Sequence, residues 1–163
     1  MPVPTPPTGH EHHASIRAGI DRVPALADML EQQPLPGAFR PAFDALVDLI
    51  EDTLLPHIEL VESGVYQELA RMLPEVSSVA PLRREDVELT DLARALASYR
   101  STLASGSLGL PEAMALRRAM YRLYALVKVH LAEEELYLRV IDGRATAPEQ
   151  QAVARGMEHV FAP

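Results

Sequence analysis

The segment PEAMALRRAMYRLYALVKVHLAEEELYLRVIDG, residues 111–143, decides the fold. Its apolar residues recur every three or four positions, which is the spacing of one buried face of an α-helix. The residues on this face are Leu116, Met120, Leu123, Val127, His130, Glu134, Tyr137 and Ile141. Pro111 suits a first helical turn, and Gly143 suits the position that follows a last one. The segment therefore predicts a long amphipathic helix that carries two polar residues, His130 and Glu134, on its buried face.

Three other segments have the same periodicity, and we expect helices over about 10–32, 41–73 and 84–103. Pro24 lies inside the first and Pro56 inside the second. Each should bend its helix, because proline lacks an N–H and clashes with the preceding turn. No segment shows the period of two that is typical of a β-strand. Four long amphipathic helices joined by short connectors predict an all-α, up-down-up-down four-helix bundle.

The connectors and the two ends of the chain differ from this pattern. Residues 1–9 are rich in proline and are expected to form a disordered lead-in, so that the single domain spans residues 10–163. Ser77–Pro81 should connect the second helix to the third, and Ala104–Leu110 the third to the fourth. A short C-terminal helix is expected from Pro148 to about Val160.

The composition excludes several classes of protein. The chain has 163 residues, a net charge of -8 and no cysteine. Without cysteine there are no thiolate metal ligands, so any metal must bind to nitrogen and oxygen atoms. The acidic balance argues against a nucleic-acid partner, and no apolar run is long enough to cross a membrane. The N-terminus lacks the features of a secretion signal, which indicates a cytoplasmic protein.

Polar residues interrupt the predicted core. His13, His57 and His130 occupy positions on three helical faces where leucine or isoleucine is expected. Glu134 follows His130 by one helical turn, and Asp86 lies near the start of the third helix's apolar face. Unpaired polar groups are costly in the interior of a bundle. These residues should therefore either pair with one another or bind a ligand.

The spacing of His130 and Glu134 suits a metal ion. Side chains four residues apart lie about 40° from one another around a helix, so both can reach the same ion. Carboxylate-rich sites inside helical bundles hold pairs of iron or manganese ions. On the first helix, His12 is an alternative to His13 if the helix is slightly rotated, and the whole cluster that begins at His10 could instead be a solvated helix start.

Two sequence blocks resemble the hemerythrin-like, or HHE cation-binding, family. In PHIELVESGVY, residues 56–66, a histidine is followed by paired acids and a Val-Tyr step, and HLAEEELY, residues 130–137, is similar to the family's fourth-helix block. The resemblance extends over about residues 9–142. It implies a four-helix bundle with a non-heme di-iron centre that histidine and carboxylate side chains hold directly. Members of this family bind dioxygen or nitric oxide, store iron, or sense iron and oxygen.

The resemblance implies roles for six residues. The terminal ligands would be His13, His57, Asp86 and His130, while Glu62 and Glu134 would bridge or chelate. The implied cofactor is iron, as two non-heme ions. Asp86 stands where the family usually has a histidine, which makes the site richer in oxygen and leaves manganese or a single metal ion as alternatives.

The second helix also departs from the family pattern. The usual acid position, four residues after His57, holds Val61. The nearest acid, Glu62, lies about 140° from His57 on an ideal helix. A distortion at Pro56 or Gly64 would be needed to bring it into the site. A degenerate, metal-free bundle that acts as an interaction or regulatory module is therefore the alternative hypothesis.

The function that this resemblance implies is reversible binding or sensing of a small oxidant such as O₂, NO or peroxide. The sequence has no flavin, heme or ferredoxin signature that would account for a supply of electrons. This absence favours binding or sensing over enzymatic turnover, with consumption of peroxide at the same centre as a third hypothesis. The sequence specifies no protein partner.

Overall fold

The computed structural model describes residues 9–32, 34–64, 66–67, 79–106, 108–141 and 143. Within these residues all regular structure is helical, which confirms the all-α prediction. The helices follow one another in four rods, each made of one or more consecutive helices. The first rod consists of α1 (Gly9–Ile20), α2 (Val23–Asp28) and the 3₁₀ turn η1 (Met29–Glu31). The second rod consists of α3 (Phe39–Leu49), the π-helical turn η2 (Ile50–Leu54) and α4 (Leu55–Ser63). The third rod is α6 (Val79–Ser105) and the fourth is α7 (Leu110–Ile141).

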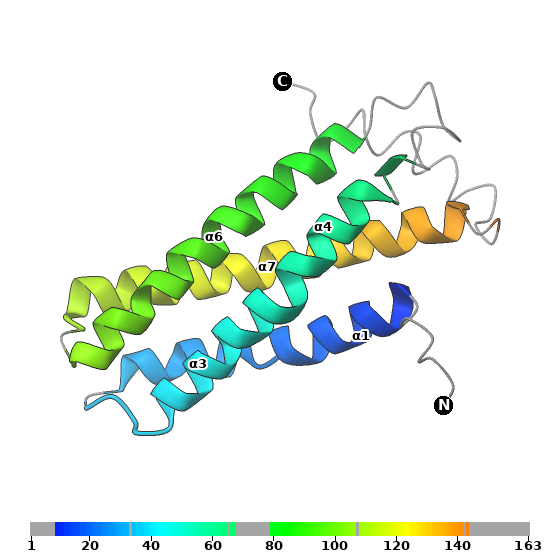
Figure 1. Ribbon diagram of the computed structural model, residues 1–163. Coiled ribbons are helices and arrows are strands. Elements are labelled where there is room, and N and C mark those ends of the chain that lie inside the picture. The colour runs from blue at the N-terminus through cyan, green and yellow to red at the C-terminus, as the bar shows by residue number, and fades with distance from the viewer. Residues whose placement is uncertain are drawn as a thin grey trace, which may run out of the picture.

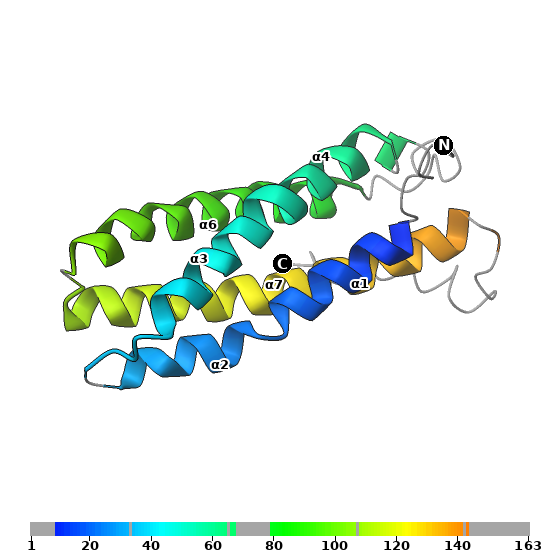
Figure 2. The same ribbon diagram turned by 60° about the horizontal axis from the view of Figure 1, so that its bottom comes forward.

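The four rods pack into a bundle in which α7 contacts α6 along one side and α1 and α2 along another (Figures 1 and 2). The predicted inner face of α7 is confirmed, since Leu116, Met120, Leu123 and Val127 are completely buried. Phe39 and Phe43 of α3 are also completely buried and stack with their ring centroids 5.8 Å apart. No described helix is long and apolar enough to cross a membrane.

The prediction of one bent helix over residues 10–32 is wrong in its detail. The chain leaves the helical conformation after Ile20 and resumes it at Val23, so that two helices replace one. Pro24 lies in the first turn of α2. The first N–H groups of a helix have no partner within it, so the missing N–H of proline costs no hydrogen bond there. No helical turn precedes this position, so the proline ring has nothing to clash with. Proline therefore ends one helix and starts the next.

Two other helix boundaries differ from the predicted ones for the same reason. Helix α3 begins at Phe39 rather than near Pro41, and α6 begins at Val79 rather than near Arg84. Proline is tolerated in a first turn, so each helix extends back beyond its proline. Gly143, just beyond α7, has a φ of 65°, the left-handed conformation expected after a helix end.

The predicted connector Ser77–Pro81 is wrong at residues 79–81, which belong to α6, and Gly9 of the predicted lead-in belongs to α1. Residues 1–8, residues 77 and 78, and the predicted C-terminal helix lie outside the described residues.

A π-helical turn joins α3 to α4. The Leu55 N–H donates to the carbonyl oxygen of Ile50, five residues back instead of the four of an α-helix. The wider turn absorbs one residue, which would otherwise rotate α4 by about 100° relative to α3. Pro56 then falls in the first turn of α4, which explains why the expected irregularity lies just before it. As a result His57 faces the same interior as the buried residues of α3.

This account of the π-helical turn makes a testable prediction. Deleting Asp52 and replacing Pro56 with alanine should convert the turn to regular α-helix without changing the face that α4 presents. We expect the variant to keep its helical circular dichroism and to lose no more than about 2 kcal/mol in urea unfolding.

Deletion of Asp91 is the matched control. In the uninterrupted helix α6 it moves every later residue by about 100° and turns the buried face that contains Leu96 toward solvent. This variant should not fold. Equal destabilisation by the two deletions would contradict the role given to the turn.

Candidate metal centre

Five polar residues are buried in the described part of the bundle. They are His13 (1% exposed), His57 (3%), Asp86 (5%), His130 (0%) and Glu134 (2%). Each of the four rods contributes at least one of them: α1, α4 and α6 one each, and α7 two. All five belong to the set of six that the sequence singled out. The structure therefore brings together side chains that are up to 121 positions apart in the chain.

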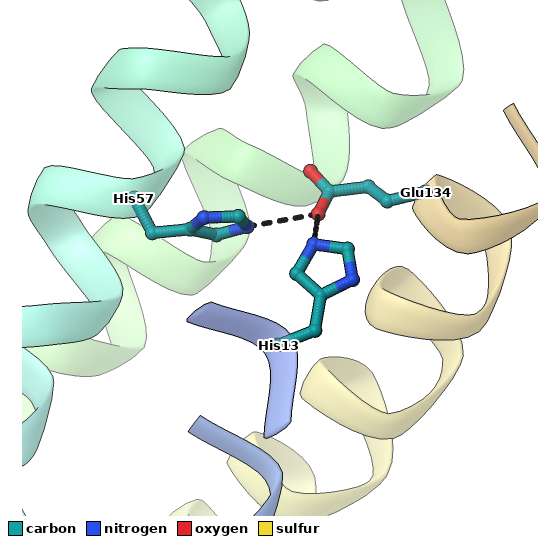
Figure 3. A group of neighbouring side chains, drawn as sticks. All are labelled: His13, His57 and Glu134. Carbon is teal, nitrogen blue, oxygen red and sulfur yellow. Dashed lines mark hydrogen bonds and ion pairs between the residues drawn. The ribbon is translucent and has the colours of Figure 1, made fainter. Parts of the chain in front are cut away.

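One oxygen of Glu134 lies between two imidazoles. Its Oε2 atom is 3.0 Å from Nε2 of His13 and 2.9 Å from Nε2 of His57 (Figure 3). The two rings meet edge to face, with centroids 4.9 Å apart. Ligand atoms of these three residues all lie within 4.8 Å of one another, so they could hold one metal ion.

The other oxygen of Glu134 faces a second group. Its Oε1 atom is 3.1 Å from Nε2 of His130, one turn earlier on α7, as the four-residue spacing predicts. The same nitrogen is 3.1 Å from Oδ1 of Asp86 on α6. Glu134 thus lies between two halves of the centre. The His13 half contains the imidazoles of His13 and His57. The Asp86 half contains the imidazole of His130 and the carboxylate of Asp86.

Carboxylates outside the centre contact the remaining nitrogens of two rings. Nδ1 of His130 donates to Oε2 of Glu85 at 3.0 Å, and Nδ1 of His13 lies 3.8 Å from Oε1 of Glu135. Arg17 in turn donates to that oxygen of Glu135 at 2.7 Å. Carboxylates thus face both nitrogens of His130: Glu85 at Nδ1, and Asp86 and Glu134 at Nε2. In the neutral tautomer with its proton on Nδ1, the Nε2 lone pair would be directed toward Asp86 and Glu134, as a metal ligand requires.

The charges of the cluster shift the pKa values of its members. Burial alone would lower the pKa of His130, but the carboxylates of Asp86, Glu134 and Glu85 outweigh it and raise the pKa to about 11. Burial would raise the pKa of Glu134, but the three surrounding imidazoles outweigh it and hold this pKa well below its usual range. Without a metal ion the centre therefore holds a protonated His130 and an ionised Glu134 at neutral pH.

The buried polar atoms of the centre are not fully satisfied by one another. Nδ1 of His13, Nε2 of His130, Oε1 of Glu134 and both carboxylate oxygens of Asp86 are buried and make no hydrogen bond, although some lie at contact distance from an oppositely charged atom. Such atoms are rare in native interiors unless water or an ion binds them. Neighbouring ligand atoms about 2.1 Å from one ion are about 3.0 to 3.4 Å apart, close to the separations found here. The donor set fits a metal ion with nitrogen and oxygen ligands.

Glu62, the sixth predicted ligand, does not reach this cluster. Its side chain is exposed, whereas that of Val61 is buried. The α-helix runs without a break from Leu55 to Ser63. Glu62 therefore keeps the separation of about 140° from His57 that an ideal helix gives it. The distortion lies before His57 and not after it. The expectation that Glu62 bridges or chelates a buried ion is therefore not met.

Two residues near the centre were given no such role by the sequence. Glu85 contacts Nδ1 of His130. In the sequence, only its position next to Asp86 indicates that it lies near the centre. Tyr66 is 1% exposed, but its buried hydroxyl makes no hydrogen bond. Burial, reinforced by the charges of Asp86 and Glu134, raises the pKa of Tyr66 and keeps the phenol neutral. A buried tyrosine within range of these carboxylates has no signature in the spacing of the sequence.

No family model matches this sequence, and no curated protein or solved structure matches it either. The functional assignment therefore depends on the geometry of the chain's own residues.

Proposed function

We propose that this chain is a hemerythrin-like metal protein, an up-down-up-down bundle with a non-heme di-iron centre that binds or senses a small oxidant. One observation carries the proposal: the buried carboxylate of Glu134 faces imidazoles on both sides, with Nε2 of His13 and His57 at one oxygen and Nε2 of His130 at the other. A carboxylate in this position suits a bridge between two ions. Histidine and carboxylate ligands suit iron and also manganese.

The residues around the centre have separate tasks in this proposal. Glu134 would contact both ions, His13 and His57 would complete one half, and His130 and Asp86 the other. Bound iron would supply open positions at which O₂, NO or peroxide can be ligated. Glu85 holds the His130 ring through its Nδ1–H and so fixes the direction of Nε2.

Buried apolar residues stand close to the proposed ligands on three of the helices. Ile58 on α4, Leu89 on α6 and Leu131 on α7 are at most 4% exposed and lie one to three positions from the proposed ligands of their helices. An apolar environment of this kind limits access of bulk solvent and reductant. This favours reversible binding or sensing over turnover.

Replacement of Glu134 tests the proposed centre directly. The Glu134→Gln variant keeps the shape of the side chain but removes the charge that faces both halves. In untagged protein expressed with added iron, we expect about two ions per wild-type chain and a loss of at least tenfold in the variant. Elemental analysis measures both, and thermal unfolding of each protein verifies that it is folded.

Glu133→Gln is the matched control, because this half-buried neighbour has the same charge and lies on the same helix. It should retain the wild-type metal content. Full metal content in Glu134→Gln would remove Glu134 from the centre. Far less than one ion per wild-type chain would instead favour the metal-free interaction module.

The raised pKa of His130 gives metal affinity a pH dependence of known sign. At neutral pH the ring is protonated in the metal-free protein, so an ion that binds Nε2 must displace a proton. We expect the affinity for Mn²⁺ to rise between about pH 7 and 9, by about tenfold per unit for one displaced proton. An imidazole with the ordinary pKa of about 6.5 gives no such rise. Electron paramagnetic resonance of free Mn²⁺ measures the affinity, and a flat profile across this range would contradict the prediction.

Reaction with small oxidants separates the proposed roles. The iron-loaded protein, reduced and kept anaerobic, should change its near-ultraviolet and visible absorbance on mixing with O₂ or NO, and the change should reverse when the gas is removed. Glu133→Gln should behave as the wild type and Glu134→Gln should not respond. Rapid evolution of oxygen from added peroxide would instead identify a peroxide-consuming enzyme. An iron-loaded protein that responds to none of the three would refute the proposed function.

A further inference from the structure

Helices α4 and α6 lie next to each other (Figure 1). A groove of about 350 Å³ lies between them. Its charged lining residues are Glu59 and Glu62 from α4 and Arg83, Asp86, Asp91 and Arg94 from α6. Five of these are exposed, whereas Asp86 is only 5% exposed. Asp86 therefore lies at the base of the groove, with the other charged side chains nearer to solvent.

Asp86 connects the groove to the buried centre. Its Oδ1 is paired with Nε2 of His130 at 3.1 Å, whereas its Oδ2 makes no hydrogen bond. A buried carboxylate oxygen without a hydrogen bond, at the base of a groove, can receive a cation. The walls of two other grooves on the described part of the chain contain no proposed ligand.

The charges along the groove favour a cation. Four carboxylates and two guanidinium groups line it. Asp91 and Arg94 lie 3.6 Å apart on α6 and largely offset each other. Glu59 and Glu62, three positions apart on α4, lie on the same side of that helix. A groove with an excess of one charge concentrates ions of the opposite sign and raises their association rate.

We propose that this groove is the path by which divalent cations reach the metal centre. Glu59 and Glu62 attract the cation at the surface, and Asp86 is the first buried group that receives it. This inference depends on the proposed function, because it needs a centre that binds metal. It assigns Glu62 a kinetic role outside the centre in place of the buried ligand role that the sequence suggested.

The rate of metal loading tests the path separately from metal affinity. Metal-free, full-length protein is mixed with Co²⁺ in a stopped-flow instrument, and binding is followed through the visible bands of bound Co²⁺. The variant with both Glu59→Gln and Glu62→Gln should load about three- to tenfold more slowly at low salt. Its final Co²⁺ content should equal that of the wild type. Arg83→Gln, which removes a positive charge from the groove, should load faster than the wild type.

Glu112→Gln is the matched control, because it removes one exposed negative charge at the start of α7, outside the groove. Its loading rate should match that of the wild type. The difference between the double variant and the wild type should shrink at about 0.5 M salt, which screens exposed charges. Unequal salt sensitivity of this kind supports steering along the groove.

Three outcomes would overturn the inference. Equal loading rates in all variants, with normal final content, would exclude the groove as the path and leave the proposed function intact. A lower final content in the double variant would mean that these glutamates bind the metal at equilibrium, and not only on its way in. Absence of Co²⁺ binding in the wild type, with no iron in the purified protein, would refute both the path and the proposed function.

Discussion

The burial of the Glu134 carboxylate constrains the whole bundle. A charged group in an apolar interior is tolerated only if other groups replace its lost hydration. Here the replacements are imidazoles from α1, α4 and α7, at 2.9 to 3.1 Å. Three rods must therefore pack with the correct rotation about their axes, and α6 must place Asp86 against His130. A rotation of one residue in any of them would leave a buried charge unpaired.

The all-helical bundle and the burial of five of the six proposed ligands could be predicted from the sequence, because both follow from helical periodicity. A histidine on a helical face otherwise made of leucine and isoleucine can be recognised as buried from its position alone. His57 and His130 are examples. Helix boundaries were less predictable, since Pro24 can either bend a helix or begin one, and only the packing of the neighbouring rods decides. The pairing of Glu85 with His130 could not be predicted because it depends on the distance between two helices, which no single helical pattern contains.

The two halves of the centre differ in chemistry. The half at His13 and His57 has two nitrogen donors and one oxygen, whereas the half at His130 has one nitrogen and two carboxylates. Nitrogen-rich sites favour ions later in the first transition series, and oxygen-rich sites are better suited to manganese and iron. The proposed centre would therefore hold a mixed population of ions when several metals are present. The oxygen-rich half is also the one that borders the groove between α4 and α6.

The π-helical turn at Ile50–Leu54 also bears on how such a chain can diverge. A wide turn of this kind stores one residue without changing what lies on either side of it. A relative could lose that residue and keep an equivalent of His57 in the same place, although its sequence would be one position shorter between the second helix's start and its histidine. Insertions and deletions inside helices are usually eliminated by selection. Here the loss of one residue, together with that of Pro56, would leave the face that carries His57 in place.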